Sequence, residues 1–86
     1  MSIFELFSLK FPGDDKAKNY RDDFLKIVMR IDPPCPPQQY ESALRRGVSQ
    51  SEGFKLFFHG YMGLPEAQRT YEKLLATFNR WLDSKP

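Results

Sequence analysis

The 86-residue sequence contains one cysteine, Cys35, and one histidine, His59. A single cysteine cannot form an internal disulfide, and small secreted domains usually carry several cysteines. The two residues are also too far apart in sequence to give the local ligand spacing of a metal site. We therefore expect a cytoplasmic protein with no metal and no disulfide framework.

The chain also lacks a long apolar run and a block of charge of one sign. Its longest apolar stretch, residues 1–11, is interrupted by Glu5 and has no basic start. It predicts neither a signal peptide nor an integral membrane segment. Thirteen basic and 11 acidic residues are spread along the chain and give a net charge of +2, so no basic patch indicates nucleic acid or anionic lipid.

No pattern typical of catalysis or cofactor binding is present. The carboxylates, such as Asp22, Asp23 and Glu72, occupy positions where helix caps and solvated helix faces are expected, not paired positions for acid and base catalysis. Gly60 and Gly63 follow no strand, which argues against a phosphate-binding loop. The sequence therefore predicts a protein that is not an enzyme and needs no cofactor.

What the chain has in abundance is aromatic residues, with eight Phe, four Tyr and one Trp. Hydrophobic residues make up 41% and charged residues 28%, values of an ordinary globular domain. At this length we expect a single helical domain covering residues 1–86.

Proline and glycine divide the chain into an apolar N-terminal segment, residues 1–13, and four helical stretches. The first stretch follows Pro12-Gly13, with Asp14 or Asp15 expected to cap its first turn. Its apolar residues recur at intervals of three and four, which predicts an amphipathic helix up to Ile31. The proline-rich residues 33–37 end this helix and form a rigid connection.

The second stretch is expected to run from Pro37 to Arg46, with Gly47 as a left-handed cap. Ser49 and Glu52 have the spacing of a capping box at the start of the third stretch, which is rich in aromatic residues. Pro65 is expected to open the fourth stretch. Its apolar stripe comprises Ala67, Tyr71, Leu74, Leu75, Phe78 and Leu82.

These patterns predict an all-α fold of about four short helices in an orthogonal or bundle-like packing. The N-terminal residues 3–11 are apolar on nearly every side, whether they form a helix or a strand. We expect them to pack on the helices as part of the core. The alternative is that they dock on a partner.

Residues 43–49, with the sequence Ala-Leu-Arg-Arg-Gly-Val-Ser, resemble the Ala-x-x-x-Gly-Val-Ser centre of helix-turn-helix DNA-binding domains. The resemblance implies a DNA-binding unit over residues 38–58, with a positive φ at Gly47 in the turn. The second helix would present Gln50, Ser51, Glu52 and Lys55, which carry little positive charge for phosphate contacts. DNA binding is therefore the alternative function.

The leading hypothesis is a non-enzymatic protein–protein interaction module: a regulator, adaptor, inhibitor or assembly subunit. Its partner would be another protein or a second copy of the chain, since aromatic, Met and Arg side chains are typical interface anchors. The alternative for these side chains is that most of them fill the core. The candidate partner-binding residues are Phe57, Phe58, Tyr61, Met62, Arg80 and Trp81.

Overall fold

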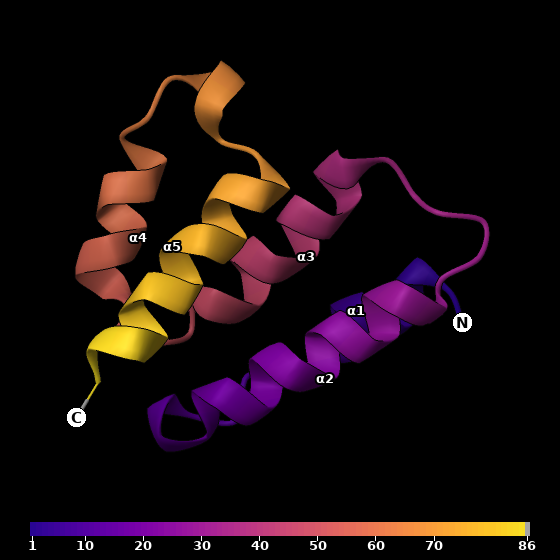
Figure 1. Cartoon of the computed structure of the whole chain (residues 1–86), viewed down its shortest axis with the longest axis horizontal. Coiled ribbons are helices and arrows are strands. Elements are labelled where there is room, and N and C mark those ends of the chain that lie inside the picture. Colours follow the sequence, from indigo (N-terminus) through magenta and orange to yellow (C-terminus); the bar gives the residue numbers. More distant parts are fainter. Residues whose placement is uncertain (86) are drawn as a thin grey trace.

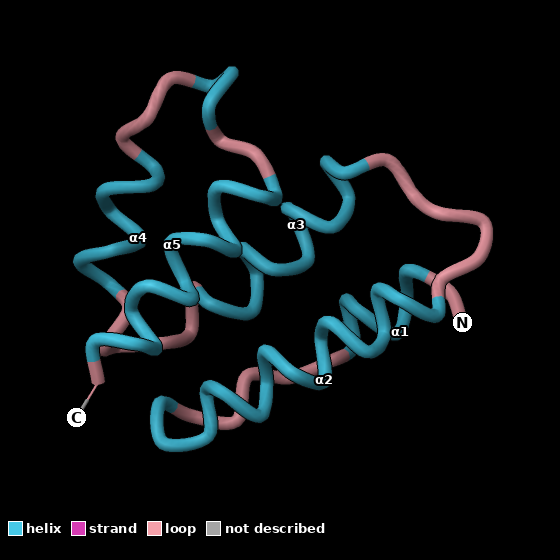
Figure 2. Tube along the Cα trace, viewed as in Figure 1, coloured by secondary structure: helices cyan, strands magenta, loops and turns pink. Residues whose placement is uncertain are grey.

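A computed structural model describes residues 1–85, which form five α-helices and contain no strand (Figures 1 and 2). The predicted all-α class is confirmed. Two short 3-10 turns, Asp14–Lys16 and Glu66–Gln68, precede helices α2 and α5. The helices are α1 (Ile3–Ser8), α2 (Ala17–Arg30), α3 (Pro37–Val48), α4 (Lys55–Met62) and α5 (Tyr71–Ser84).

Helix α3 lies in the middle of the arrangement and packs against α5 on one side and α1 on the other. Helix α4 packs on α5, and α2 lies beside α1 (Figure 1). The molecule is flattened, with extents of 35 × 30 × 18 Å. Every helix of this thin assembly therefore has one face on the core and another face at the surface.

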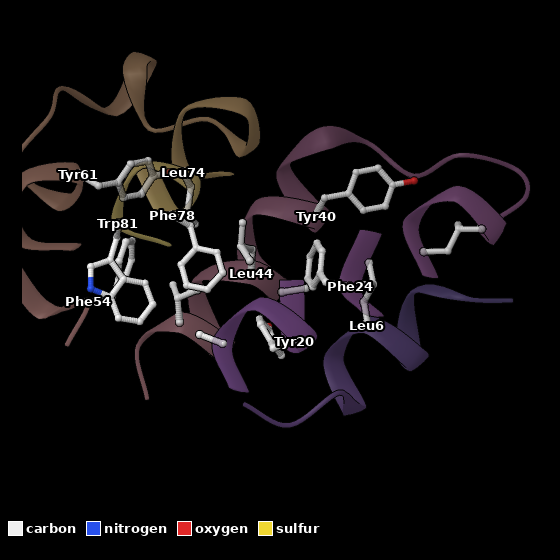
Figure 3. Packing of buried hydrophobic residues seen from close by; sticks show 14 residues of the cluster. Leu6, Tyr20, Phe24, Tyr40, Leu44, Phe54, Tyr61, Leu74, Phe78 and Trp81 are labelled. Carbon is white, nitrogen blue, oxygen red and sulfur yellow. The ribbon is translucent and has the colours of Figure 1, made fainter. Parts of the chain in front are cut away.

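Aromatic rings dominate the core (Figure 3). The Phe78 ring on α5 lies edge-on to Phe54 at 5.2 Å and to Tyr20 at 6.4 Å between ring centroids, and Trp81 lies 5.6 Å away. Edge-to-face pairs at such distances add to the free energy gained from burial of apolar area. Phe78 thus joins α5 to α2 and to the start of α4.

The N-terminal segment forms helix α1 and contributes to the core, as expected. Leu6 is only 1% exposed and belongs to the central apolar cluster. The Glu5 carboxylate accepts hydrogen bonds from the Ser2 amide at 2.8 Å and the Ser2 hydroxyl at 2.6 Å, which fixes the first turn and lowers the Glu5 pKa. Phe4, in the same turn, is 75% exposed.

The expected end of the second helix is wrong. Helix α3 continues through Gly47 to Val48, and among the described residues the glycine with positive φ is Gly13, not Gly47. Gly47 has a packing role instead, because a Cβ atom built there would lie 1.8 Å from the Tyr20 hydroxyl oxygen. The absence of a side chain lets Tyr20 of α2 approach the α3 backbone.

The expected cap of α4 is also wrong. The Ser49 hydroxyl donates to the Arg46 carbonyl at 2.8 Å, and Ser51 accepts from the Phe54 amide at 3.1 Å. Asp14 is one of the two residues expected to cap α2, but its carboxylate accepts from the Ser51 hydroxyl at 2.5 Å and from the Gly53 amide at 2.8 Å. A distant carboxylate therefore stabilises the turn before α4, which local sequence spacing could not reveal.

Helix α5 begins later than expected. Pro65 opens only a 3-10 turn, and Ala67 is exposed instead of lying on the apolar stripe. Thr70 caps the true start by accepting a hydrogen bond from the Lys73 amide at 3.2 Å. From there Leu74 and Phe78 are fully buried, as the stripe predicted.

The proline-rich residues 33–36 form the non-helical connection between α2 and α3. Within it, the Cys35 amide donates a hydrogen bond to the Tyr40 hydroxyl at 2.9 Å. Cys35 itself is half-buried. This connection lies at the opposite end of the molecule from α4 (Figure 1).

Candidate interaction surface

The six candidate partner-binding residues separate into two groups. Tyr61 and Trp81 are only 2% and 5% exposed and belong to the core (Figure 3). Phe57, Phe58 and Met62 are half-buried. Arg80 is exposed. The second group, which reaches the surface, therefore consists of Phe57, Phe58, Met62 and Arg80.

A groove of about 410 Å³ runs between α4 and α5 and contains three of the six candidates. Helix α4 and the turn after it line the groove with Leu56, Phe57, Gly60, Tyr61 and Leu64. Helix α5 contributes Lys73, Thr77 and Arg80. We refer to this feature as the α4–α5 groove.

Tyr61 and Thr77 are the two buried residues of the lining, which we call the floor of the α4–α5 groove, and both of their hydroxyl groups donate hydrogen bonds within the molecule. The Tyr61 hydroxyl donates to the Glu41 carboxylate at 2.6 Å, and the Thr77 hydroxyl donates to the Lys73 carbonyl at 2.8 Å. Neither hydroxyl group therefore has a hydrogen left to donate to a ligand. Such a floor favours apolar side chains.

The charged side chains that line the groove are Lys73 and Arg80. The Arg80 guanidinium lies over the Phe57 ring, 5.7 Å from its centroid, a cation–π contact that holds it at the rim. Within residues 1–85 neither cation forms an intramolecular ion pair. Both remain available to a negatively charged partner.

The sequence analysis did not select five residues of the groove lining: Leu56, Gly60, Leu64, Lys73 and Thr77. Leu56 is 85% exposed at the edge of the groove, whereas Phe54, two positions earlier, is fully buried. Its position off the apolar stripe of α4 was the available signal, because a large apolar residue on the polar side of a helix cannot contribute to the core. Phe58 and Met62, in contrast, lie outside the groove lining.

A second apolar region lies over α1. The exposed Phe4 borders a hollow of about 650 Å³ together with Phe7, Lys10 and Arg46. This hollow contains none of the six candidate residues. Met29, on α2, is as exposed as Leu56 at 85%, but it lines neither hollow.

A buried carboxylate, that of Glu41, contacts the Tyr61 side chain of the groove. Glu41 is only 7% exposed, accepts from Tyr61 and lies 3.7 Å from the Arg45 guanidinium. Burial, together with the hydrogen bond to Glu41, raises the Tyr61 pKa well above its usual range. The phenol therefore stays protonated at neutral pH and remains the donor in this contact.

The residues that the helix-turn-helix resemblance assigns to DNA lie at the α3–α4 turn. Gln50 and Lys55 are exposed, but Ser51 is only 2% exposed. Lys55 forms an ion pair with Glu52 at 3.3 Å. Gly47 is helical and does not provide the expected turn.

Comparisons with protein-family models, curated proteins and solved structures found no match to this chain. In the part of the chain that the structure describes, no helix is long and apolar enough to cross a membrane. The same residues contain no group of three or more potential metal ligands.

Proposed function

We propose that this protein is a non-enzymatic, cytoplasmic interaction module that acts as a regulator, adaptor, inhibitor or assembly subunit. Its binding surface is the α4–α5 groove, and its partner is another protein or a second copy of the chain. The observation that carries this proposal is the 85% exposure of Leu56 at the edge of an apolar-floored groove.

A single exposed leucine is common on protein surfaces, but Leu56 is continuous with the groove and with the half-buried Phe57. The ring of Phe57 in turn contacts Arg80. Apolar and aromatic side chains with an arginine at the edge are the composition found in energetically important parts of interfaces. The candidate surface therefore contains only part of the set of six predicted residues, and it is centred on Leu56.

Site-specific photo-cross-linking in the producing cells tests this proposal. A photoreactive amino acid replaces Leu56 in one strain and Met29 in another, since both side chains are 85% exposed. We expect irradiation to give one defined adduct, identified by mass spectrometry, from position 56 and none from position 29. The same adducts from both positions, or none from either, would contradict a binding role of the groove.

Duplex DNA is the alternative partner, supported by the exposure of Arg46, Gln50 and Lys55 around the α3–α4 turn. Binding through phosphates would weaken steeply as salt rises. We expect only weak, nonspecific retention on duplex DNA at physiological salt. Sequence-specific retention that is lost in Lys55→Ala would support the DNA alternative and contradict the groove proposal.

A further inference from the structure

We infer that the α4–α5 groove accepts an acidic amphipathic helix of the partner protein. This inference rests on the proposed function and adds the chemistry of the ligand. The juxtaposition that carries it is an apolar floor flanked by two unpaired cations, Lys73 and Arg80.

Apolar recognition follows from the hydrogen bonds beneath the groove. The Tyr61 and Thr77 hydroxyl groups are both used within the molecule. A hydrogen-bond acceptor such as a carboxylate placed on the floor would lose its water without gaining a donor from these hydroxyl groups, which is unfavourable. The part of the ligand that enters the groove is therefore apolar, and Leu56 and Phe57 extend the contact along α4.

Acidic recognition follows from the charges at the rim. Lys73 and Arg80 line the groove, and no carboxylate does so. The Phe57 ring covers one face of the Arg80 guanidinium, which leaves the N–H groups at its edge free to bind a carboxylate in a bidentate manner. A basic ligand would meet two like charges, and complementary charge is a main source of specificity at interfaces.

The spacing of the two cations fits a helical ligand. Lys73 and Arg80 are separated by seven positions on α5, which corresponds to two helical turns and a rise of about 10.5 Å. A helix lying along the groove presents side chains seven positions apart on the same face. Carboxylates at this spacing can face both cations, while apolar residues three and four positions apart enter the groove between them.

A random library of 12-residue peptides displayed on phage is selected on the wild-type protein, on Leu56→Asp and on the double variant Lys73→Glu/Arg80→Glu. The matched control is Lys18→Glu/Lys26→Glu, which changes the net charge equally at exposed positions of α2. Circular dichroism confirms that all four proteins keep the same helix content. Binding of the enriched peptides is then measured by fluorescence anisotropy.

We expect peptides enriched on the wild type to be acidic, with apolar residues at helical spacing. Their affinity should fall about tenfold or more in Leu56→Asp and in Lys73→Glu/Arg80→Glu, but not in the α2 control. Leu56-dependent peptides without an acidic bias would overturn the inference and leave the groove proposal intact. Peptides that bind equally well to Leu56→Asp would contradict both.

Discussion

The buried tyrosines Tyr20 and Tyr61 differ in what their hydroxyl groups contact. The Tyr61 hydroxyl donates to Glu41 at 2.6 Å. The Tyr20 hydroxyl is buried against Gly47 and has no hydrogen-bond partner within residues 1–85. Removing the oxygen atom from each phenol should therefore have different consequences for stability.

Tyr20→Phe should leave the free energy of unfolding unchanged or raise it by up to about 1 kcal/mol, because it removes a buried polar atom without a partner. Tyr61→Phe should lower it by about 1–3 kcal/mol, because the buried Glu41 carboxylate loses a hydrogen bond. Urea unfolding at pH 7 measures both variants against the wild type. Equal losses of unfolding free energy in the two variants would contradict the difference in hydrogen bonding between the two hydroxyl groups.

The same tyrosines should make the protein sensitive to alkali. Burial raises the pKa of Tyr20 to about 12, and burial with the Glu41 hydrogen bond raises that of Tyr61 further. The unfolded chain releases these protons near pH 10, so this contribution to stability is fully present below pH 10 and declines as the pH rises toward the folded values. The slope should be at most about 1.4 kcal/mol per pH unit for each tyrosine.

Urea unfolding at pH 9, 10 and 11 measures this decline. Because Tyr20→Phe removes one of the titrating groups, its stability should fall less steeply above pH 10 than that of the wild type. All other ionisable groups are the same in both proteins, so the difference between the two slopes isolates Tyr20. Identical slopes would show that Tyr20 does not titrate with folding.

At the scale of helices, Gly47 and Gly60 are both helical glycines in different surroundings. A Cβ atom at Gly47 would lie 1.8 Å from the Tyr20 hydroxyl oxygen, whereas a Cβ atom at Gly60 would have no neighbour within 4 Å. The first glycine permits contact between α2 and α3. The second one leaves α4 with a residue of poor helix propensity and no packing reason for it.

Gly47→Ala should therefore destabilise the protein by about 1–3 kcal/mol, since Tyr20 must move out of its packed position. Gly60→Ala should stabilise it by about 0.5–1 kcal/mol through helix propensity and the lower entropy of the unfolded chain. Thermal and urea unfolding of the two variants provide the comparison. If Gly47→Ala is as stable as Gly60→Ala, the close approach of Tyr20 is not a constraint.

Helix positions were predictable where the apolar spacing is regular. The spacing places Tyr20 and Phe24 on the buried face of α2, and Leu74 and Phe78 on that of α5. The ends of helices were less predictable. The cap of the turn before α4 uses Asp14, which is 39 positions from Gly53, and no local pattern contains a partner at that distance.

The candidate site was only partly predictable for a similar reason. Aromatic residues are typical of both cores and interfaces, so composition alone could not assign Tyr61 and Trp81. The structure buries both, because α5 and the start of α4 face one another through Phe54 and Phe78. Leu56, off the stripe of α4, is left at the surface.

At the scale of the whole molecule, deletion of the N-terminal segment tests how much helix α1 contributes to the stability of the fold. Deletion of residues 1–8 removes Leu6 from the core and uncovers the α1-facing side of α3. We expect the free energy of unfolding to fall by at least about 2 kcal/mol, the value of burying one large apolar side chain, with lower cooperativity of thermal unfolding.

Phe4→Ser is the control for this deletion, because Phe4 is 75% exposed and its substitution should change stability by less than about 0.5 kcal/mol. An unchanged melting temperature after the deletion would show that α1 is a docking arm and not part of the core. A large loss in Phe4→Ser would instead place that ring in a packed environment.

The proposed role of the α4–α5 groove is tested most directly by the affinity of the cross-linked partner for two matched variants, Leu56→Asp and Met29→Asp. Both replace an 85% exposed apolar side chain with a carboxylate, so both variants should remain folded. Isothermal titration calorimetry with the purified partner should give a Kd at least about tenfold weaker for Leu56→Asp and an unchanged Kd for Met29→Asp. A wild-type Kd for Leu56→Asp would contradict the proposal that this groove is the binding surface.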